Sequence, residues 1–389
     1  MNKIPSWPLA AAILLTANVM DVTHPAAAAE RNGGNAVGAN SSTSPTKFET
    51  VPPGEAEQIG KIATLTKELL QQRYGDSLAR RGVHPKDHGC VKAALTVNPD
   101  IPENYRVGVF AKPARTYDAW IRFSNATGTV TADVGGAISR GMAIKLMGVE
   151  GDTLLGESGA KTQDFLLINQ PMFAIANVPT YLKLNSLLLL HRDNTAKVFP
   201  ELFKTMAPDE AKKTQAILGL IAQTKLGNPL ESRYFSASPF LFGKDTVAKF
   251  GVTPRNPNKT PVPENASVNY LRAAMRRSLS ITEGSPAVFD FQVQLRTNDS
   301  LPIEDASAEW KETDAKFQNV AVLTITQQEF DNPLRITECE HLVFTPWHGL
   351  AEHKPLGGIN RLRLQVYIAS SQHRAEAREP SAFPTEYPR

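Results

Sequence analysis

The motif RGVHPKDHG, residues 81–89, contains two side chains suited to acid–base chemistry. His84 is one of them, and an imidazole accepts and returns protons close to neutral pH. His88 is the other, one helical turn further along by number. A histidine that precedes a proline, as His84 does, is otherwise an ordinary loop residue. The motif therefore indicates a candidate acid–base site and leaves the structural alternative open.

A charged residue inside the apolar segment AWIRFS, residues 119–124, is the second feature. If this segment is a strand, Trp120, Arg122 and Ser124 lie on one face of it. Burial of an unpaired guanidinium is costly, so Arg122 on such a strand indicates an anionic partner. A carboxylate suits this role, because arginine binds carboxylates through two parallel hydrogen bonds. The alternative is an arginine at the end of a strand that faces water.

The spacing of apolar residues predicts the elements that position these side chains. Residues 55–74 have helical spacing, and Gly75 is suited to end that helix. From Ala93 the chain changes to short runs rich in β-branched and aromatic residues, with turn signals between them. Residues 179–226 are again helical in pattern. Short successive strands favour a barrel or sandwich, and the mixture predicts an α+β fold in one domain, residues 55–370.

The composition is that of an ordinary globular protein. The chain has 389 residues, of which 41% are hydrophobic and 21% are charged. The formal net charge is +3 and no long basic block occurs, so nucleic-acid binding is not expected. Cys90 and Cys339 are the two cysteines. Two cysteines do not make a disulfide framework, and whether they pair stays open.

The N-terminus has the pattern of a secretory signal peptide over residues 1–29. Lys3 precedes an apolar run, and small residues follow in HPAAAAE. We expect cleavage near Ala29, a periplasmic or secreted protein, and no stable membrane insertion after cleavage. An uncleaved anchor is the alternative. Residues 30–54 are rich in Asn, Gly and Ser and predict a flexible linker, and residues 371–389 a polar tail.

Four motifs in order carry a resemblance to a known family. They are RGVHPKDHG, RFSNATG (122–128), RGMAIKL (140–146) and INQPMF (168–173). This series resembles the haem-binding core of the catalase superfamily, and the chain is similar in length to its shorter, catalase-related peroxidase branch. The resemblance implies a catalase-like antiparallel β-barrel with surrounding helices that enclose a buried haem b.

The resemblance also implies roles for individual residues. His84 takes the place of the distal acid–base histidine, in preference to His88. Asn169 takes the place of the asparagine that hydrogen-bonds the bound peroxide. The implied cofactor-binding residues are Arg81, Arg122, Ser124 and Phe173, with the two arginines facing the haem propionates.

The axial ligand is expected to be a tyrosine, as in catalases. In the family an arginine precedes this tyrosine by four residues, and a glycine follows. Aligning NPLESRYFSASPFLFG on Gly243 makes Tyr234 the axial iron ligand, with Leu230 in the place of the arginine. Aligning it on Arg233 puts Ala237 there, which supplies no ligand. Tyr234 is therefore the predicted ligand, and an ordinary core tyrosine is the alternative.

The predicted function is that of a haem peroxidase that reduces hydrogen peroxide or organic hydroperoxides with a small reductant, with weak catalase activity. One alternative is a fatty-acid hydroperoxide dehydratase or isomerase, and another is a haem-binding pseudoenzyme. We expect a monomer or small homo-oligomer. The segment PWHGLAEHKPLGGINR contains His348 and His353, and their spacing is not that of a helical metal-binding pair. We expect this segment to be structural or to line the entrance of the pocket.

Overall fold

The fold is built around a β-barrel. In the structure, a computed structural model, residues 43–75, 77, 80–155, 161–257 and 259–374 are described. The predicted signal peptide lies outside these residues. The strands are β1 (Asp87–Val97), β2 (Thr116–Asn125), β3 (Arg140–Met147), β4 (Thr162–Ile168), β5 (Tyr234–Phe235), β6 (Phe240–Leu241), β7 (Val247–Pro254), β8 (Ala287–Leu295) and β9 (Phe317–Ile325).

All the strand pairs are antiparallel, and they close on themselves. The order of the sheet is β5-β4-β3-β2-β1-β9-β8-β7-β6. The short strand β5 pairs with β4 on one side and with β7 on the other, which closes the barrel. The chain thus confirms the predicted α+β fold with an antiparallel barrel. Closure leaves no long exposed edge on the barrel strands.

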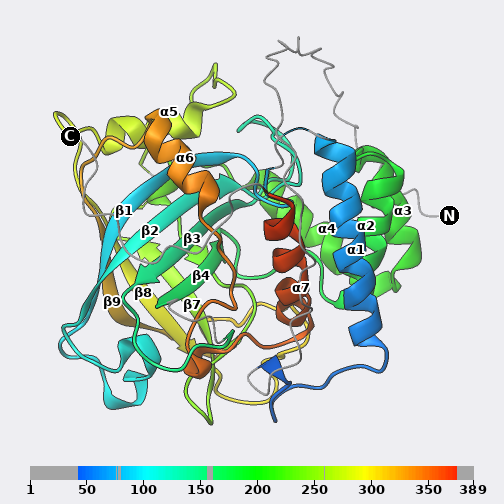
Figure 1. Cartoon of the computed structure of the whole chain (residues 1–389), viewed down its shortest axis with the longest axis horizontal. Helices are drawn as coiled ribbons and strands as arrows, with labels where there is room; N and C mark the ends of the chain where they lie inside the picture. The colour runs from blue at the N-terminus through cyan, green and yellow to red at the C-terminus, as the bar shows by residue number, and fades with distance from the viewer. Residues whose placement is uncertain (1–42, 76, 78–79, 156–160, 258, 375–389) are drawn as a thin grey trace, which may run out of the picture. The chain divides into compact units, whose positions relative to one another are not determined.

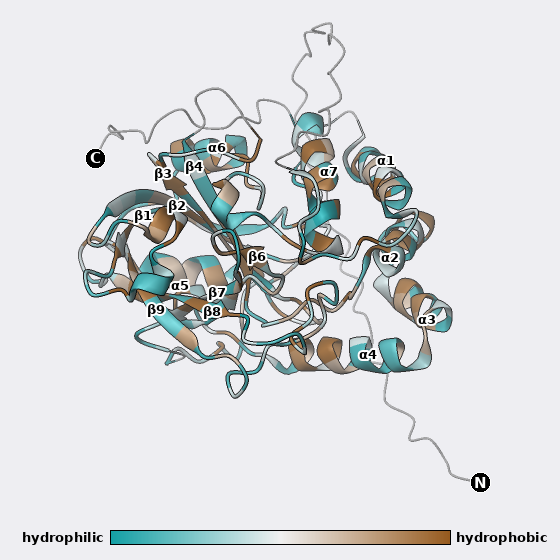
Figure 2. Cartoon of the chain, turned by 90° about the horizontal axis from the view of Figure 1, so that it is seen from below, coloured by the Kyte–Doolittle hydropathy of each residue, from teal (hydrophilic) through white to brown (hydrophobic). Residues whose placement is uncertain are grey.

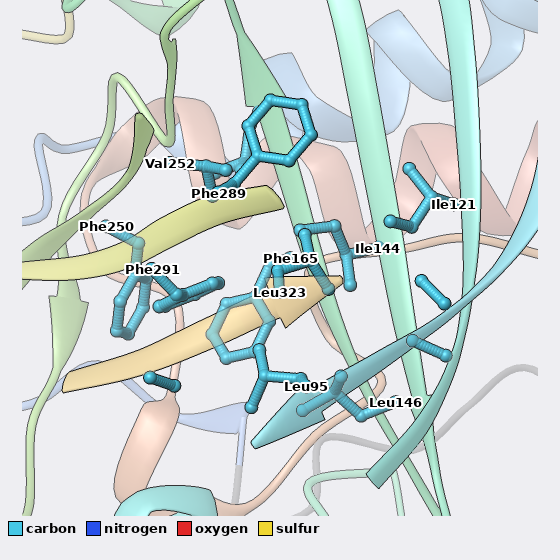
Figure 3. Close-up of a cluster of buried hydrophobic side chains, with 14 of the residues drawn as sticks. Leu95, Ile121, Ile144, Leu146, Phe165, Phe250, Val252, Phe289, Phe291 and Leu323 are labelled. Atoms are coloured by element: carbon cyan, nitrogen blue, oxygen red, sulfur yellow. The ribbon is translucent and has the colours of Figure 1, made fainter. Parts of the chain in front are cut away.

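Alternation along each strand fills the barrel interior with apolar side chains (Figure 3). On β2, Ala119, Ile121 and Phe123 belong to the interior cluster. Trp120 packs outside with a different cluster, and Arg122 and Ser124 line an external cavity. The predicted division of this strand into two faces is therefore confirmed, because side chains alternate with a period of two.

Helices surround the barrel, most of them on one side of it (Figure 1). They are α1 (Glu55–Tyr74), α2 (Val178–Leu190), α3 (Thr195–Thr205), α4 (Pro208–Gln223), α5 (Tyr270–Ser278), α6 (Pro333–His341) and α7 (Gly358–His373). Helix α1 packs against both α2 and α7, and α6 lies over β1. Each of α1, α2, α3 and α7 carries both hydrophobic and hydrophilic residues (Figure 2). Among the described residues, no helix combines the length and apolarity of a membrane span.

The described part of the predicted linker is packed against the helical side. Glu49 binds Arg361 at 2.6 Å and accepts the backbone N–H of Gly357 at 2.8 Å. Arg361 also pairs with Glu55 and Glu304 at 2.6 and 2.8 Å. These buried charges are paired with one another, as burial requires. They attach residues 43–54 to the start of α7.

Cys90 and Cys339 form a disulfide, with their Cα atoms 5.9 Å apart. The sequence left open whether these two cysteines pair, and the structure shows that they do. The bond joins β1 to the last turn of α6, which are 249 residues apart in sequence. Helix α6 is therefore fixed covalently to the barrel wall.

Candidate functional site

One cavity lies outside the barrel, between the outer face of β2, β3 and β4 and the helices α1, α2 and α7. The loop that precedes β1 and the chain that follows α6 complete its walls. Most of its lining is apolar, including Leu69 of α1, Leu184 and Leu188 of α2 and Val366 of α7.

His84 lines this cavity from the loop before β1. Its backbone has a φ of 61°, in the left-handed region, and its N–H donates to the carbonyl of Thr127 at 2.8 Å. Its ring Nδ1 lies 2.9 Å from the Oγ of Ser124. The hydrogen bond at Nδ1 leaves Nε2 as the nitrogen for a ligand. A strained backbone that its surroundings hold in place is typical of a functional residue.

His84 is a neutral base. Burial, and then the positive charges of Arg122, Arg363 and Arg81, lower its pKa to about 3. At neutral pH the imidazole is therefore unprotonated and able to accept a proton.

Four arginines line the cavity; Arg73 pairs with Asp193, whereas Arg81, Arg122 and Arg374 all contact Glu340, and we call these three the arginine cluster. All three are buried, with exposed fractions of 9%, 2% and 8%. Glu340 is their acidic partner: its carboxylate lies 3.0 Å from Arg81 and 3.6 Å from Arg122. Burial alone raises the pKa of Glu340, but the charges of the cluster outweigh burial and leave that pKa lowered.

Two N–H groups of the arginine cluster have no acceptor among the described residues. They are the Nε–H groups of Arg122 and Arg374, and both are buried. Burial lowers the pKa of Arg374 to about 10, so its charge is retained at neutral pH. Buried donors without acceptors are costly, and a carboxylate is the kind of acceptor that suits a guanidinium.

Helix α7 brings Tyr367 to the cavity. Arg363, one helical turn earlier, donates from Nη2 to the Tyr367 hydroxyl at 3.4 Å, and its guanidinium lies 5.4 Å from the centre of the Tyr367 ring. Residues four apart on a helix are neighbours, so this pairing follows from the spacing. The Tyr367 hydroxyl is thereby held at the cavity by a neighbouring guanidinium on the same helix.

The structure does not bring Tyr234, the predicted axial ligand, to the cavity. Tyr234 is fully buried in the barrel interior, where its hydroxyl donates to the carbonyl of Pro229 at 2.8 Å and its ring meets that of Phe123 edge-on. Burial raises the pKa of its phenol. The core reading was correct, because β5 turns Tyr234 inward where β4 and β7 close the barrel.

Sequence reasoning missed Tyr367, Arg363 and Arg374. The signal begins where the last motif quoted from the sequence ends: residues 359–367, INRLRLQVY, contain an arginine four residues before a tyrosine. That is the pattern sought for the axial ligand. The predicted domain boundary at residue 370 also fell inside α7, three residues before its end and four before Arg374.

The structure does not bring Asn169 and Phe173 to the cavity wall. The Asn169 side chain accepts the backbone N–H of Arg140 at 2.6 Å, where β3 begins. Phe173 packs behind the site, with the Arg363 guanidinium 5.7 Å from its ring centre. The roles predicted for these two residues are therefore not supported. An amide does line the cavity, that of Asn185 on α2.

The other three histidines singled out from the sequence, His88, His348 and His353, have structural environments. His88 Nε2 lies 2.9 Å from the amide oxygen of Asn125, in a buried polar network beside β1. His348 lies 3.4 Å from Asp164. His353 accepts the N–H of Val109 at 3.2 Å among phenylalanine rings. For His348 and His353 this agrees with the structural reading, and neither of them lines the cavity.

No protein-family model matches the chain, and no curated protein matches its sequence. Among solved structures it resembles a fungal catalase at 14% identity and a TM-score of 0.60, over 77% of this chain and 60% of that one. A bacterial catalase matches at 13% and 0.58, over 88% and 67% of the two chains. Catalase A from Saccharomyces cerevisiae matches at 13% and 0.61, over 88% and 70%.

These comparisons define the fold. The chain has a catalase-like fold, as its motifs indicated, with a barrel and surrounding helices that superimpose on three catalases. It spans 60% of the length of the fungal catalase. Fold by itself does not carry function, which must be argued from the site.

Proposed function

We propose that this chain binds haem b in the cavity and reduces peroxides there with a small reductant. The observation that carries the proposal is that Tyr367, the His84–Ser124 pair and the arginine cluster line one cavity, with Arg363 bonded to Tyr367 from behind the cavity wall. These are the parts that a haem peroxide enzyme requires: an axial anion, an acid–base group and cations for the propionates.

The donor set fits haem in kind. Tyr367 supplies the phenol oxygen that would bind the iron, and Arg363 donates a hydrogen bond to that oxygen. The unpartnered Nε atoms of Arg122 and Arg374 suit two carboxylates. The apolar remainder of the lining suits a porphyrin ring. When bound, haem supplies the redox chemistry of peroxide reduction.

The contribution of the protein centres on His84. Its neutral imidazole accepts the proton of the incoming peroxide at Nε2 and returns that proton to the departing oxygen. Ser124 holds the ring through Nδ1, so that the same nitrogen faces the substrate in both steps. Low solvent access keeps the imidazole neutral between turnovers.

The apolar walls extend the proposal to organic hydroperoxides. Leu69, Leu184 and Leu188 give α1 and α2 a hydrophobic surface on the cavity, which suits an alkyl or aryl group. Rearrangement of a fatty-acid hydroperoxide needs the same surface. Product analysis separates the two: reduction yields an alcohol, whereas dehydration or isomerisation yields an epoxide or another product without consuming reductant.

We also propose that the protein is exported, as its first 29 residues suggest. The Cys90–Cys339 disulfide supports this, because such bonds persist in oxidising compartments. N-terminal sequencing of the protein recovered from the periplasm or medium tests export: a start near residue 30 is expected, and an intact start at Met1 in the cytoplasm contradicts it.

The experiment that tests the function is titration of the purified chain with hemin, followed by peroxide. We expect saturable binding at one equivalent, with the spectrum of a tyrosinate-bound ferric haem. Hydrogen peroxide and cumene hydroperoxide should then be consumed in the presence of a phenolic reductant. Absence of saturable hemin binding overturns the proposal, and binding without peroxide consumption favours a haem-binding pseudoenzyme.

A further inference from the structure

The three guanidinium groups of the arginine cluster are held mainly by one short piece of chain. Arg81 donates to the carbonyls of Cys339 at 2.9 Å and Leu342 at 2.7 Å, and to the carboxylate of Glu340 at 3.0 Å. Arg374 donates to the carbonyls of Glu340 and Leu342.

Arg122 is held by the same piece. It pairs with the carboxylate of Glu340 at 3.6 Å and has one further acceptor, the carbonyl of Pro85 at 3.5 Å. We call residues 339–342 the clamp segment. Among the described residues, all the other hydrogen-bond acceptors of the arginine cluster belong to it. The orientation of the three guanidinium groups in the arginine cluster therefore depends on the position of the clamp segment.

The clamp segment is fixed at one point by a covalent bond. Cys339 is its first residue and is bonded to Cys90 on β1. In the register of β1 and β2, Cys90 stands directly opposite Arg122. The disulfide therefore links the backbone next to Glu340 to Cys90, which lies opposite Arg122. Arg122 in turn pairs with Glu340. The connection between Glu340 and Arg122 is short, because it runs through one peptide unit, the disulfide and one cross-strand pair.

The charges show what the clamped cluster is suited to bind. Three guanidinium charges and the one carboxylate of Glu340 give +3 − 1 = +2 for the residues Arg81, Arg122, Arg374 and Glu340. A dicarboxylate balances that excess. The unpartnered Nε atoms of Arg122 and Arg374 are donors of the right kind for it.

We propose that the clamp segment, anchored by the Cys90–Cys339 disulfide, positions the arginine cluster for the two carboxylates of the haem, and that breaking the disulfide weakens this anionic part of binding selectively. The inference rests on the proposed function. Breaking the bond changes no charge at the site, so its effect is one of position. Glu340 is a positioning residue in this account, because it acts through Arg81 and Arg122.

The test uses two ligands that share the porphyrin and the iron: hemin, which carries two carboxylates, and hemin dimethyl ester, in which methyl esters replace them and remove their charge. Affinities for both are measured with the full chain, with the Cys90→Ser/Cys339→Ser variant, and with the wild type reduced by an added dithiol. In that reduction the S–S bond breaks, each sulfur gains a hydrogen, and the dithiol becomes its own disulfide. Val320→Ala, inside the barrel, is the control for a general loss of stability.

We expect the affinity for hemin to fall about tenfold in the variant and in the reduced protein, a change of about 1.4 kcal/mol. The affinity for the dimethyl ester should change less than about twofold, and Val320→Ala should not alter the ratio of the two affinities. Equal losses for both ligands, or none, overturn the inference while leaving haem binding intact. Unfolding of both disulfide-free forms also overturns the inference, because the bond is then needed for the stability of the whole fold and not selectively for the arginine cluster. Failure of the wild type to bind either ligand instead refutes the proposed function.

Discussion

Gly141 on β3 lies directly against the imidazole of His84. A Cβ atom on this glycine comes within 2.6 Å of ring atoms Cε1 and Nδ1, and within 2.8 Å of the Oγ of Ser124. Carbon atoms do not approach one another so closely, so any side chain at position 141 displaces the His84–Ser124 pair. The absence of a side chain here is a requirement of the site, since the strand itself accepts alanine readily.

Gly141→Ala should therefore impair catalysis more than cofactor binding. A displacement of the imidazole by a few tenths of an ångström or more lowers the rate of reaction with hydrogen peroxide by up to about 100-fold. Haem affinity should stay within a few-fold of the wild type. The matched control is Gly219→Ala on α4, where the new methyl group meets no atom within 4 Å. A variant at position 141 with the wild-type rate contradicts this account.

His84→Asn isolates the acid–base role. Asparagine tolerates the left-handed backbone at this position, so the loop is expected to keep its shape. We expect haem to bind as before and the reaction with peroxide to slow by about 10² to 10⁴-fold, the usual contribution of a general base. Stopped-flow spectra after mixing with peroxide measure this. Unchanged kinetics assign the proton transfer to another group.

The pH profile follows from the lowered pKa of His84. A base with a pKa of about 3 is neutral at every pH from 5 to 8, so the wild-type rate with peroxide should be flat over that range. Activity should fall only when the pH approaches 4 and protonation begins. A fall in rate with a midpoint near pH 6.5 shows that the imidazole titrates normally and contradicts the burial argument.

His353 gives a prediction about stability. Burial among phenylalanine rings lowers its pKa to about 3, against 6.5 in the unfolded chain. Below pH 6.5 the unfolded state binds a proton that the native state does not, so the free energy of unfolding falls by about 1.4 kcal/mol per pH unit down to the native pKa.

Urea unfolding at pH 7, 6, 5 and 4 measures this linkage. The slope of the free energy of unfolding against pH should be smaller in His353→Gln by the contribution of one proton, about 1.4 kcal/mol per pH unit. The amide of glutamine keeps an acceptor for the Val109 N–H. Equal slopes in the two proteins show that His353 is protonated or exposed in the native state.

The sequence predicted the wall of the site that is built from strands, and the reason is local. The two-residue period of β2 separates Arg122 and Ser124 from the barrel interior whatever the rest of the chain does. Arg81 and His84 lie a few residues before β1, so short motifs specify them. Helix α1 was also predicted with its bounds, because apolar spacing and Gly75 define it.

The helical wall was not predicted, because its residues depend on contacts distant in sequence. Tyr367 reaches the cavity because α7 packs against α1, some 300 residues earlier in the chain. Tyr234 has the same residue type but sits on β5, whose two residues carry too little pattern to show that they close a barrel. The contacts of Glu340 with Arg81 and Arg122 likewise join residues more than 200 positions apart, which spacing does not reveal.

The most direct test of the central claim is the absorption spectrum of the haem complex in two tyrosine variants. Tyr367→Phe removes the cavity-lining phenol next to Arg363, whereas Tyr234→Phe removes only a hydroxyl bonded to Pro229 inside the barrel. We predict that Tyr367→Phe loses the tyrosinate signature and binds haem at least about tenfold more weakly, while Tyr234→Phe keeps the wild-type spectrum. Loss of the signature in Tyr234→Phe, with Tyr367→Phe unchanged, contradicts the account.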